Sequence, residues 1–215
     1  MKLIMENWKR FLKEEILEEA AVENIDDQGL LVFPSLDNPQ YIILYNHRIA
    51  RPLLRRMNYD NIEMIHNAVL QLRFNAKRNA LEVDQVWAKK RSGLGPTLYR
   101  IAAQLASQAG LSGIVPNVVK NQVSDEAKNV WRNFNDGLGS SYLEPTQFDD
   151  GNHQEDYLNS TYSLRDDSST ISLEKALANN DRVLSEDEHG EWKIAILETA
   201  DIVLRSAMNK VYGDR

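Results

Sequence analysis

Residues 80–106 read ALEVDQVWAKKRSGLGPTLYRIAAQLA, and they place a strand, a glycine-containing loop and a helix in direct succession. Ala80–Trp87 is rich in residues that favour strands. Pro96 suits the first turn of a helix, where its missing N–H costs little. The apolar stripe of that helix continues to about Ala109, and Gly110 ends it. This succession of strand and helix predicts an α/β or α+β domain.

The elements around this stretch follow from the same patterns. Asn67–Phe74 is a second β-rich run, and the turn formers at 75–79 join it to the strand at 80–87 as a hairpin. Further strands are expected at 29–33 and 41–45, and helices at 1–20, 49–57, from Ser124, at 172–178 and at 191–212. Residues 135–170 are predicted to be acidic and loop-rich.

Composition excludes several classes of protein. The chain has 215 residues, of which 42% are hydrophobic, and it has no cysteine. Disulfides and cysteine-ligated zinc are therefore excluded. A mean hydropathy of −0.49 and the lack of a long apolar run argue against a transmembrane helix. Residues 1–5 lack the features of a secretory signal, so we expect a cytosolic or virion setting.

Charge is unevenly distributed along the chain. Residues 46–100 hold eleven Lys or Arg against four acids, whereas residues 141–190 hold three against twelve. The basic stretch is suited to an anionic ligand, although two solvated surfaces that pair with each other would give the same pattern. The overall charge of −7 disfavours general nucleic-acid binding.

The loop between strand and helix is the one motif with a clear chemistry. Glycines let a backbone approach a phosphate closely, and the N–H groups that open a helix face the anion. Lys89, Lys90 and Arg91 add positive charge beside Gly93 and Gly95. The loop lacks the ending of a Walker motif and the third glycine of a dinucleotide fingerprint. A glycine turn that binds no ligand is the alternative interpretation.

Two segments give this loop a family resemblance. Lys90-Arg91-Ser92-Gly93-Leu94-Gly95 resembles the acyl-CoA loop of the GNAT N-acetyltransferase superfamily, which reads Arg/Gln-x-x-Gly-x-Gly/Ala. Gly95-Pro96-Thr97-Leu98-Tyr99, together with Val123-Ser124-Asp125-Glu126-Ala127-x-x-Val130-Trp131, is similar to GNAT-like domains of tailed-phage proteins. The resemblance covers roughly residues 65–135.

The resemblance implies a GNAT-like mixed, twisted sheet flanked by helices, whose strands splay at the glycine loop around acetyl-CoA. The expected organisation is a leader or docking helix at 1–22, a GNAT-like core at 25–148, and acidic loops and C-terminal helices at 149–215. The implied cofactor-binding residues are Val86, Lys90, Arg91, Ser92, Gly93, Leu94, Gly95 and Thr97.

Acetyl transfer to an amine also needs groups that move protons. Glu82 and Asp84 alternate onto one face of the strand, so either could act as base; an exposed edge or a salt bridge to Lys77 or Arg78 is the alternative. His66 is a further candidate base, with a structural role as its alternative. Trp131 replaces the family's proton-donating tyrosine, which leaves Tyr99 or Tyr142 as the acid.

Metal binding has little support in the sequence. The four histidines, at positions 47, 66, 153 and 189, have no ligand spacing, so no metal site is expected. Asp149-Asp150-Gly151-Asn152 shares a few residue types with a calcium loop but lacks its period-two ligands and closing Glu.

Two functions are carried forward. The first is a phage-encoded, acetyl-CoA-dependent N-acetyltransferase that acts on an unknown amine. The second is a catalytically inactive, GNAT-like phage protein that binds other virion or host proteins through its terminal helices. Residues 1–20 resemble the trimmed capsid-targeting leaders of tailed phages, with a docking helix as the alternative. The implied location is the host cytoplasm, with packaging in the virion as a further expectation.

Overall fold

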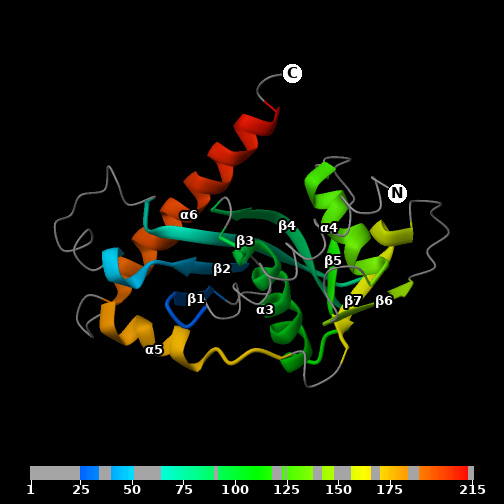
Figure 1. Cartoon of the computed structure of the whole chain (residues 1–215), viewed down its shortest axis with the longest axis horizontal. Coiled ribbons are helices and arrows are strands. Elements are labelled where there is room, and N and C mark those ends of the chain that lie inside the picture. The colour runs from blue at the N-terminus through cyan, green and yellow to red at the C-terminus, as the bar shows by residue number, and fades with distance from the viewer. Residues whose placement is uncertain are drawn as a thin grey trace, which may run out of the picture. The chain divides into compact units, whose positions relative to one another are not determined.

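Figure 1 shows a computed structural model of the chain, which has a mixed α+β fold with a seven-stranded sheet. The structure describes residues 25–33, 40–50, 64–89, 92–117, 123, 125–137, 142–147, 156–165, 170–183 and 189–212. The predicted fold class is confirmed at this level. Among the described residues, no helix combines the length and apolar character needed to cross a membrane.

The sheet contains both parallel and antiparallel pairs. Its strands are β1 (Gly29–Phe33), β2 (Gln40–Tyr45), β3 (His66–Asn75), β4 (Ala80–Ala88), β5 (Ile114–Pro116), β6 (Leu143–Gln147) and β7 (Ser160–Leu164). Their order across the sheet is β1-β2-β3-β4-β5-β7-β6. β4 and β5 are parallel, whereas β1 and β2, β5 and β7, and β6 and β7 pair antiparallel. The helices are α3 (Leu94–Gln108), α4 (Asp125–Asn135), α5 (Glu174–Val183) and α6 (His189–Tyr212), with the 3-10 helix η2 (Asp156–Leu158).

Two compact units make up the described chain. Unit 1 comprises the described parts of Leu72–Asp84 and Tyr99–Ile171. Unit 2 comprises the described parts of Ala20–Gln71, Gln85–Leu98 and Ser172–Arg215. β3, β4 and α3 therefore contribute residues to both units.

Unit 1 packs around aromatic rings. Trp131, in α4, is only 2% exposed. Tyr99 of α3 meets it edge-on, with ring centroids 5.3 Å apart, and Phe134 lies 5.4 Å from Tyr99. Tyr162 of β7 is 5.1 Å from Trp131 and donates its hydroxyl to the Tyr157 carbonyl at 2.6 Å. Buried aromatic rings contribute much of the apolar area that stabilises such a unit.

Unit 2 has an aliphatic core between α6 and the strands β1, β2 and β3. Its buried members are Leu31, Ile43, Tyr45, Ala50, Ile65, Val69, Ala195, Ile196, Ala200 and Leu204, with Trp87 packed against them. On α6, Ile196, Ala200 and Leu204 recur at a spacing of four, which places them on one face of the helix. Their removal from water is the main force holding α6 in this unit.

The central hairpin and the helix after the glycine loop are confirmed. The structure ends β3 at Asn75 and begins β4 at Ala80, and α3 runs from Leu94 to Gln108. The loop-rich interpretation of residues 135–170 was wrong, because β6 and β7 lie there. β6 has one buried and four exposed residues and pairs only with β7, so it carries no apolar alternation for sequence patterns to detect.

Several predictions fall outside the described residues. These are the helix at 1–20, most of the helix at 49–57, the calcium-loop alternative at 149–152, and residues Lys90, Arg91 and Ser124.

Candidate functional site

The loop between β4 and α3 forms a compact, capped entry to the helix. The Ser92 N–H donates to the Lys89 carbonyl at 3.1 Å, and the Leu94 N–H donates to Ser92 Oγ at 3.3 Å. Gly93 lies between them with φ of 69°, a conformation that side-chain-bearing residues rarely adopt. Ser92 and Gly93 therefore shape the turn itself.

The start of α3 is suited to an anion. Its first turn contains no acidic residue. The first N–H groups of a helix have no intrahelical acceptor and carry the positive end of the helix dipole. Ser92 Oγ accepts from the Leu94 N–H, and Pro96 supplies no N–H, so Gly95 and Thr97 provide the remaining backbone donors of this turn.

Gly95 is not required by the fold in the way that Gly93 is. A Cβ built on Gly95 would meet only the Ala88 Cβ, at an ordinary 3.8 Å. Alanine would fit and would favour the helix. Packing therefore gives no reason for glycine at position 95, whereas close approach of a ligand to the backbone does.

The other predicted cofactor-binding residues contribute differently. The Leu94 and Thr97 side chains are buried, at 2% and 3% exposed, so only their backbone is suited to a ligand. Val86 is half-buried in β4. Lys90 and Arg91 lie outside the described residues.

The parallel pairing of β4 and β5 is short. It joins Leu81 to Ile114 and ends where Val83 meets Pro116, with the Asn117 N–H donating to the Val83 carbonyl at 3.2 Å. β5 ends there, while β4 continues to Ala88. Among the described residues, the pairing of β4 with β5 thus covers only Leu81–Val83.

β3 stays close to the backbone that enters the glycine loop. The Lys89 N–H, directly after β4, donates to the carbonyl of Asn67, near the start of β3, at 2.8 Å. This hydrogen bond fixes the end of β4 beside β3.

Glu82 and Asp84 have different surroundings in unit 1. Glu82 is half-buried, and its Oε2 accepts from Asn75 at 2.8 Å. The Asp84 side chain is 2% exposed; Asn117 donates to its Oδ1 at 2.6 Å, and Arg73 forms an ion pair with Oδ2 at 2.9 Å. Arg73 is thus a cationic partner of Asp84 that the sequence patterns did not name.

The candidate acids lie in the aromatic cluster. Tyr99 is 3% exposed, and burial raises the pKa of its hydroxyl well above the usual range. Such a phenol holds its proton tightly, which opposes a role as acid. Tyr142 is also largely buried, with the Arg100 guanidinium 5.1 Å from the centre of its ring.

His66 packs against α6 in unit 2. The Thr199 hydroxyl donates to the Ala195 carbonyl at 2.8 Å, so its oxygen accepts from His66 Nε2, also at 2.8 Å. His66 Nδ1 is buried without a hydrogen-bond partner among the described residues. Burial lowers the pKa of His66 to about 4, and the imidazole is therefore neutral at pH 7. These contacts favour the structural interpretation of His66.

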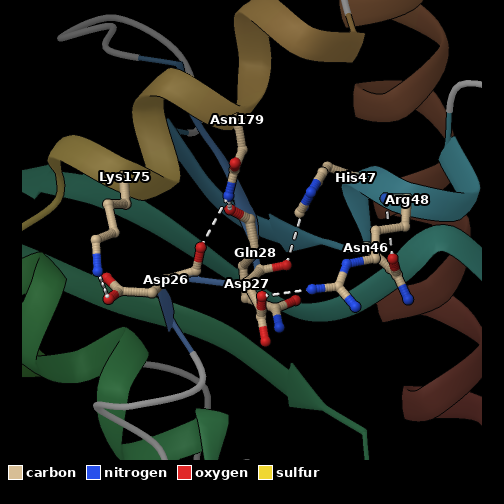
Figure 2. Close-up of polar contacts among 8 residues, drawn as sticks. All are labelled: Asp26, Asp27, Gln28, Asn46, His47, Arg48, Lys175 and Asn179. Atoms are coloured by element: carbon tan, nitrogen blue, oxygen red, sulfur yellow. Dashed lines mark hydrogen bonds and ion pairs between the residues drawn. The ribbon is translucent and has the colours of Figure 1, made fainter.

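A second polar cluster, shown in Figure 2, joins the turn at residues 25–28 to α5 and to the residues after β2. Asn179 donates to the backbone carbonyls of Asp26 at 3.0 Å and Gln28 at 2.7 Å. Lys175 pairs with Asp26, and Arg48 pairs with Asp27 at 2.7 Å. Every contact satisfies a backbone group or an exposed charge, so this cluster fastens α5 to β1.

Sequence patterns left Arg73 and Asn117 out of the site. Arg73 could have been found, because in a hairpin it alternates with Asn75 on the face that meets Glu82 and Asp84. Asn117 could not, because it follows β5, a strand too short to give a periodic signal. In the part of the chain that the structure describes, no group of His, Asp and Glu side chains is arranged to hold a metal ion.

We compared the chain with protein-family models, with curated proteins and with solved structures, and found no match in any of them. The geometry must therefore carry the functional argument.

Proposed function

We propose that this chain is an acetyl-CoA-dependent N-acetyltransferase of the GNAT type that transfers acetyl to an amine. The observation that carries the proposal is the capped turn between β4 and α3. Its Gly93 has a positive φ, its Gly95 has no packing role, and no acid stands in the first turn of the helix. These features suit a backbone that binds a diphosphate.

The sheet supports the same proposal. The resemblance implies a mixed sheet whose strands separate at the glycine loop, where the pantetheine arm would lie. Among the described residues, the parallel β4–β5 pairing joins only Leu81–Val83 to Ile114–Pro116. A pairing this short is what the resemblance implies for these two strands.

In this proposal, acetyl-CoA supplies an acetyl thioester: a C–N bond forms to the amine, and the C–S bond breaks to give free CoA thiol. The amine loses one proton and the sulfur gains one. Glu82 is the better suited base, because it is half-buried and, among the described residues, only Asn75 donates to its carboxylate. Asp84 is buried, accepts from Asn117 and pairs with Arg73, so it is better suited to positioning. Burial raises the pKa of the Tyr99 hydroxyl, which opposes its role as the acid.

Release of CoA thiol from acetyl-CoA, measured against a panel of amines, tests this function. We expect amine-dependent release that falls about 100-fold or more in Glu82→Gln, since a general base typically contributes that much. Acetyl-CoA binding should persist in that variant, because Glu82 is not part of the loop. If no amine in the panel supports release above the rate of hydrolysis in buffer, the enzyme proposal is wrong.

The second candidate is a phage structural or interaction protein on the same scaffold, acting in the host cytoplasm or the virion. Two observations favour it: Trp131 is fully packed where the family carries tyrosine, and α6 exposes Ile194 and Ile202 by more than half. It predicts a stable complex with another virion or host protein. Size-exclusion chromatography of the full chain with lysate from infected cells, followed by Ile202→Glu, would test it.

A further inference from the structure

A strip of polar side chains lies on the β3–β4 hairpin within unit 1. Asn75 donates to Glu82, Arg73 pairs with Asp84, and Asn117 donates to Asp84 from just beyond β5. Residues two apart on a strand point to the same face, so Arg73 and Asn75 share a face with Glu82 and Asp84. One sheet face thus holds a guanidinium and two carboxylates with defined partners.

Asp84 is the most buried of these charged groups. Its side chain is 2% exposed; Oδ1 accepts a hydrogen bond from Asn117, and Oδ2 forms the ion pair with Arg73 without hydrogen-bond geometry. Burial of the Asp84 carboxylate costs free energy, which its attraction to Arg73 offsets, so the pair gives little net stability. The attraction does favour one position of the Arg73 guanidinium, beside Asp84.

Arg73 is exposed where Asp84 is not. Its side chain is 49% exposed, so part of the arginine that pairs with Asp84 is accessible to a solute. Arginine presents five donors in a planar fork that matches a carboxylate with two parallel hydrogen bonds. An arginine already held in place loses less freedom on binding than a mobile surface arginine does.

Glu82 supplies the opposite charge on the same face. It lies two residues from Asp84 on β4, a separation of about 7 Å along the strand. A half-buried carboxylate is suited to an ammonium group. The strip therefore presents Arg73 for an anion and Glu82 for a cation on one sheet face, which are the two charges that bind a zwitterion.

We propose that this strip binds the acceptor, and that the acceptor is an amine that also carries a carboxylate, as a free amino acid does. Arg73 binds the carboxylate, Asp84 and Asn117 position Arg73, and Glu82 receives the amine. The assignment of this ligand as acetyl acceptor rests on the proposed function; the carboxylate site itself rests on the strip alone.

Binding of N-acetylglycine and N-acetylglycinamide, measured by calorimetry on the full chain, tests the inference without requiring turnover. N-acetylglycine ends in a negatively charged carboxylate, whereas N-acetylglycinamide ends in a neutral amide. We expect N-acetylglycine to bind at least tenfold more tightly. Arg73→Lys should weaken that binding about 10- to 100-fold, because the fork is lost, and should leave the amide unaffected.

Arg73→Gln alone would strand the buried Asp84 charge, so Arg73→Gln with Asp84→Asn is the variant that removes the pair together. It should bind both probes equally. Arg48→Gln removes an exposed Arg–Asp pair in unit 2 and is the matched control, with binding unchanged. Equal binding of the two probes to the wild-type chain, no binding of either, or an undiminished preference in both Arg73 variants would overturn the inference.

Acetyl-CoA binding, measured in the same samples, separates this inference from the proposed function. Acetyl-CoA binding without a carboxylate preference overturns the inference and leaves the transferase proposal standing. A carboxylate preference that depends on Arg73 without acetyl-CoA binding supports the site but overturns its assignment to an acetyl acceptor.

Discussion

Acidification should destabilise the fold through His66, a residue buried between β3 and α6. Burial lowers its pKa from 6.5 in the unfolded chain to about 4 in the folded one. The difference, at about 1.36 kcal/mol per pKa unit, corresponds to about 3 kcal/mol. The physical cause is Nδ1, which would have to carry a proton in a dry site without an acceptor.

The sign follows from proton binding. Between pH 6.5 and 4 the unfolded chain binds a proton at His66 that the folded chain does not, so acid favours unfolding. The contribution of His66 is complete above about pH 6.5, falls as the pH drops, and levels off below about pH 4. The carboxylates add their own pH dependence to the free energy of unfolding, which is removed by comparison with a variant that lacks only His66.

Urea unfolding followed by circular dichroism at pH 7, 6, 5 and 4.5 measures the effect. His66→Gln keeps a donor for Thr199 but does not titrate, so the wild-type chain should lose about 2–3 kcal/mol more than this variant does between pH 7 and 4.5. His47→Gln, at a partly exposed histidine, controls for loss of an imidazole. Parallel pH profiles for the wild type and His66→Gln would refute the reasoning.

Three further changes test the loop, the α5 contact and the buried tyrosine. Gly95→Ala should raise the free energy of unfolding by about 0.5–1 kcal/mol, and Gly93→Ala should lower it by about 1–2 kcal/mol because of its positive φ; denaturant melts of both variants check the contrast. Asn179→Ala should cost about 1–3 kcal/mol, since two backbone carbonyls lose their donor, and a melt showing no loss would contradict Figure 2. Tyr99→Phe should preserve the ring packing and any turnover, because the buried hydroxyl is a poor acid; loss of turnover with acetyl-CoA binding intact would restore Tyr99 as the proton donor.

The sequence was most informative where one pattern dominated. β-rich runs on both sides of residues 75–79 indicated the hairpin, and an apolar stripe after Pro96 indicated α3. Strands that depend on their neighbours gave no such signal. β5 has three residues, and β6 exposes four of its five, so both are defined by pairing rather than by their own composition.

Some residues of the candidate site could be predicted from local sequence, and others could not. The glycine loop could be located from Gly93 and Gly95, because their spacing and their place before a helix are properties of sequence. The partners of Asp84 could not all be located, because Asn117 reaches it through a parallel pairing that no local pattern encodes. The different partners of the Glu82 and Asp84 carboxylates likewise depend on packing, which the sequence pattern does not encode.

Thermal unfolding with and without excess acetyl-CoA tests the central claim most directly. At about a hundred times its dissociation constant, a ligand stabilises by about 2.7 kcal/mol, or about 5–10 °C for a chain of this length. Gly95→Glu places a carboxylate where the diphosphate would bind. An acid in the first turn of a helix is itself favourable, so this variant should block the ligand without destabilising α3. The account predicts a shift of that size in the wild type and in Glu82→Gln, and none in Gly95→Glu. No shift in the wild type, or an equal shift in Gly95→Glu, would contradict it.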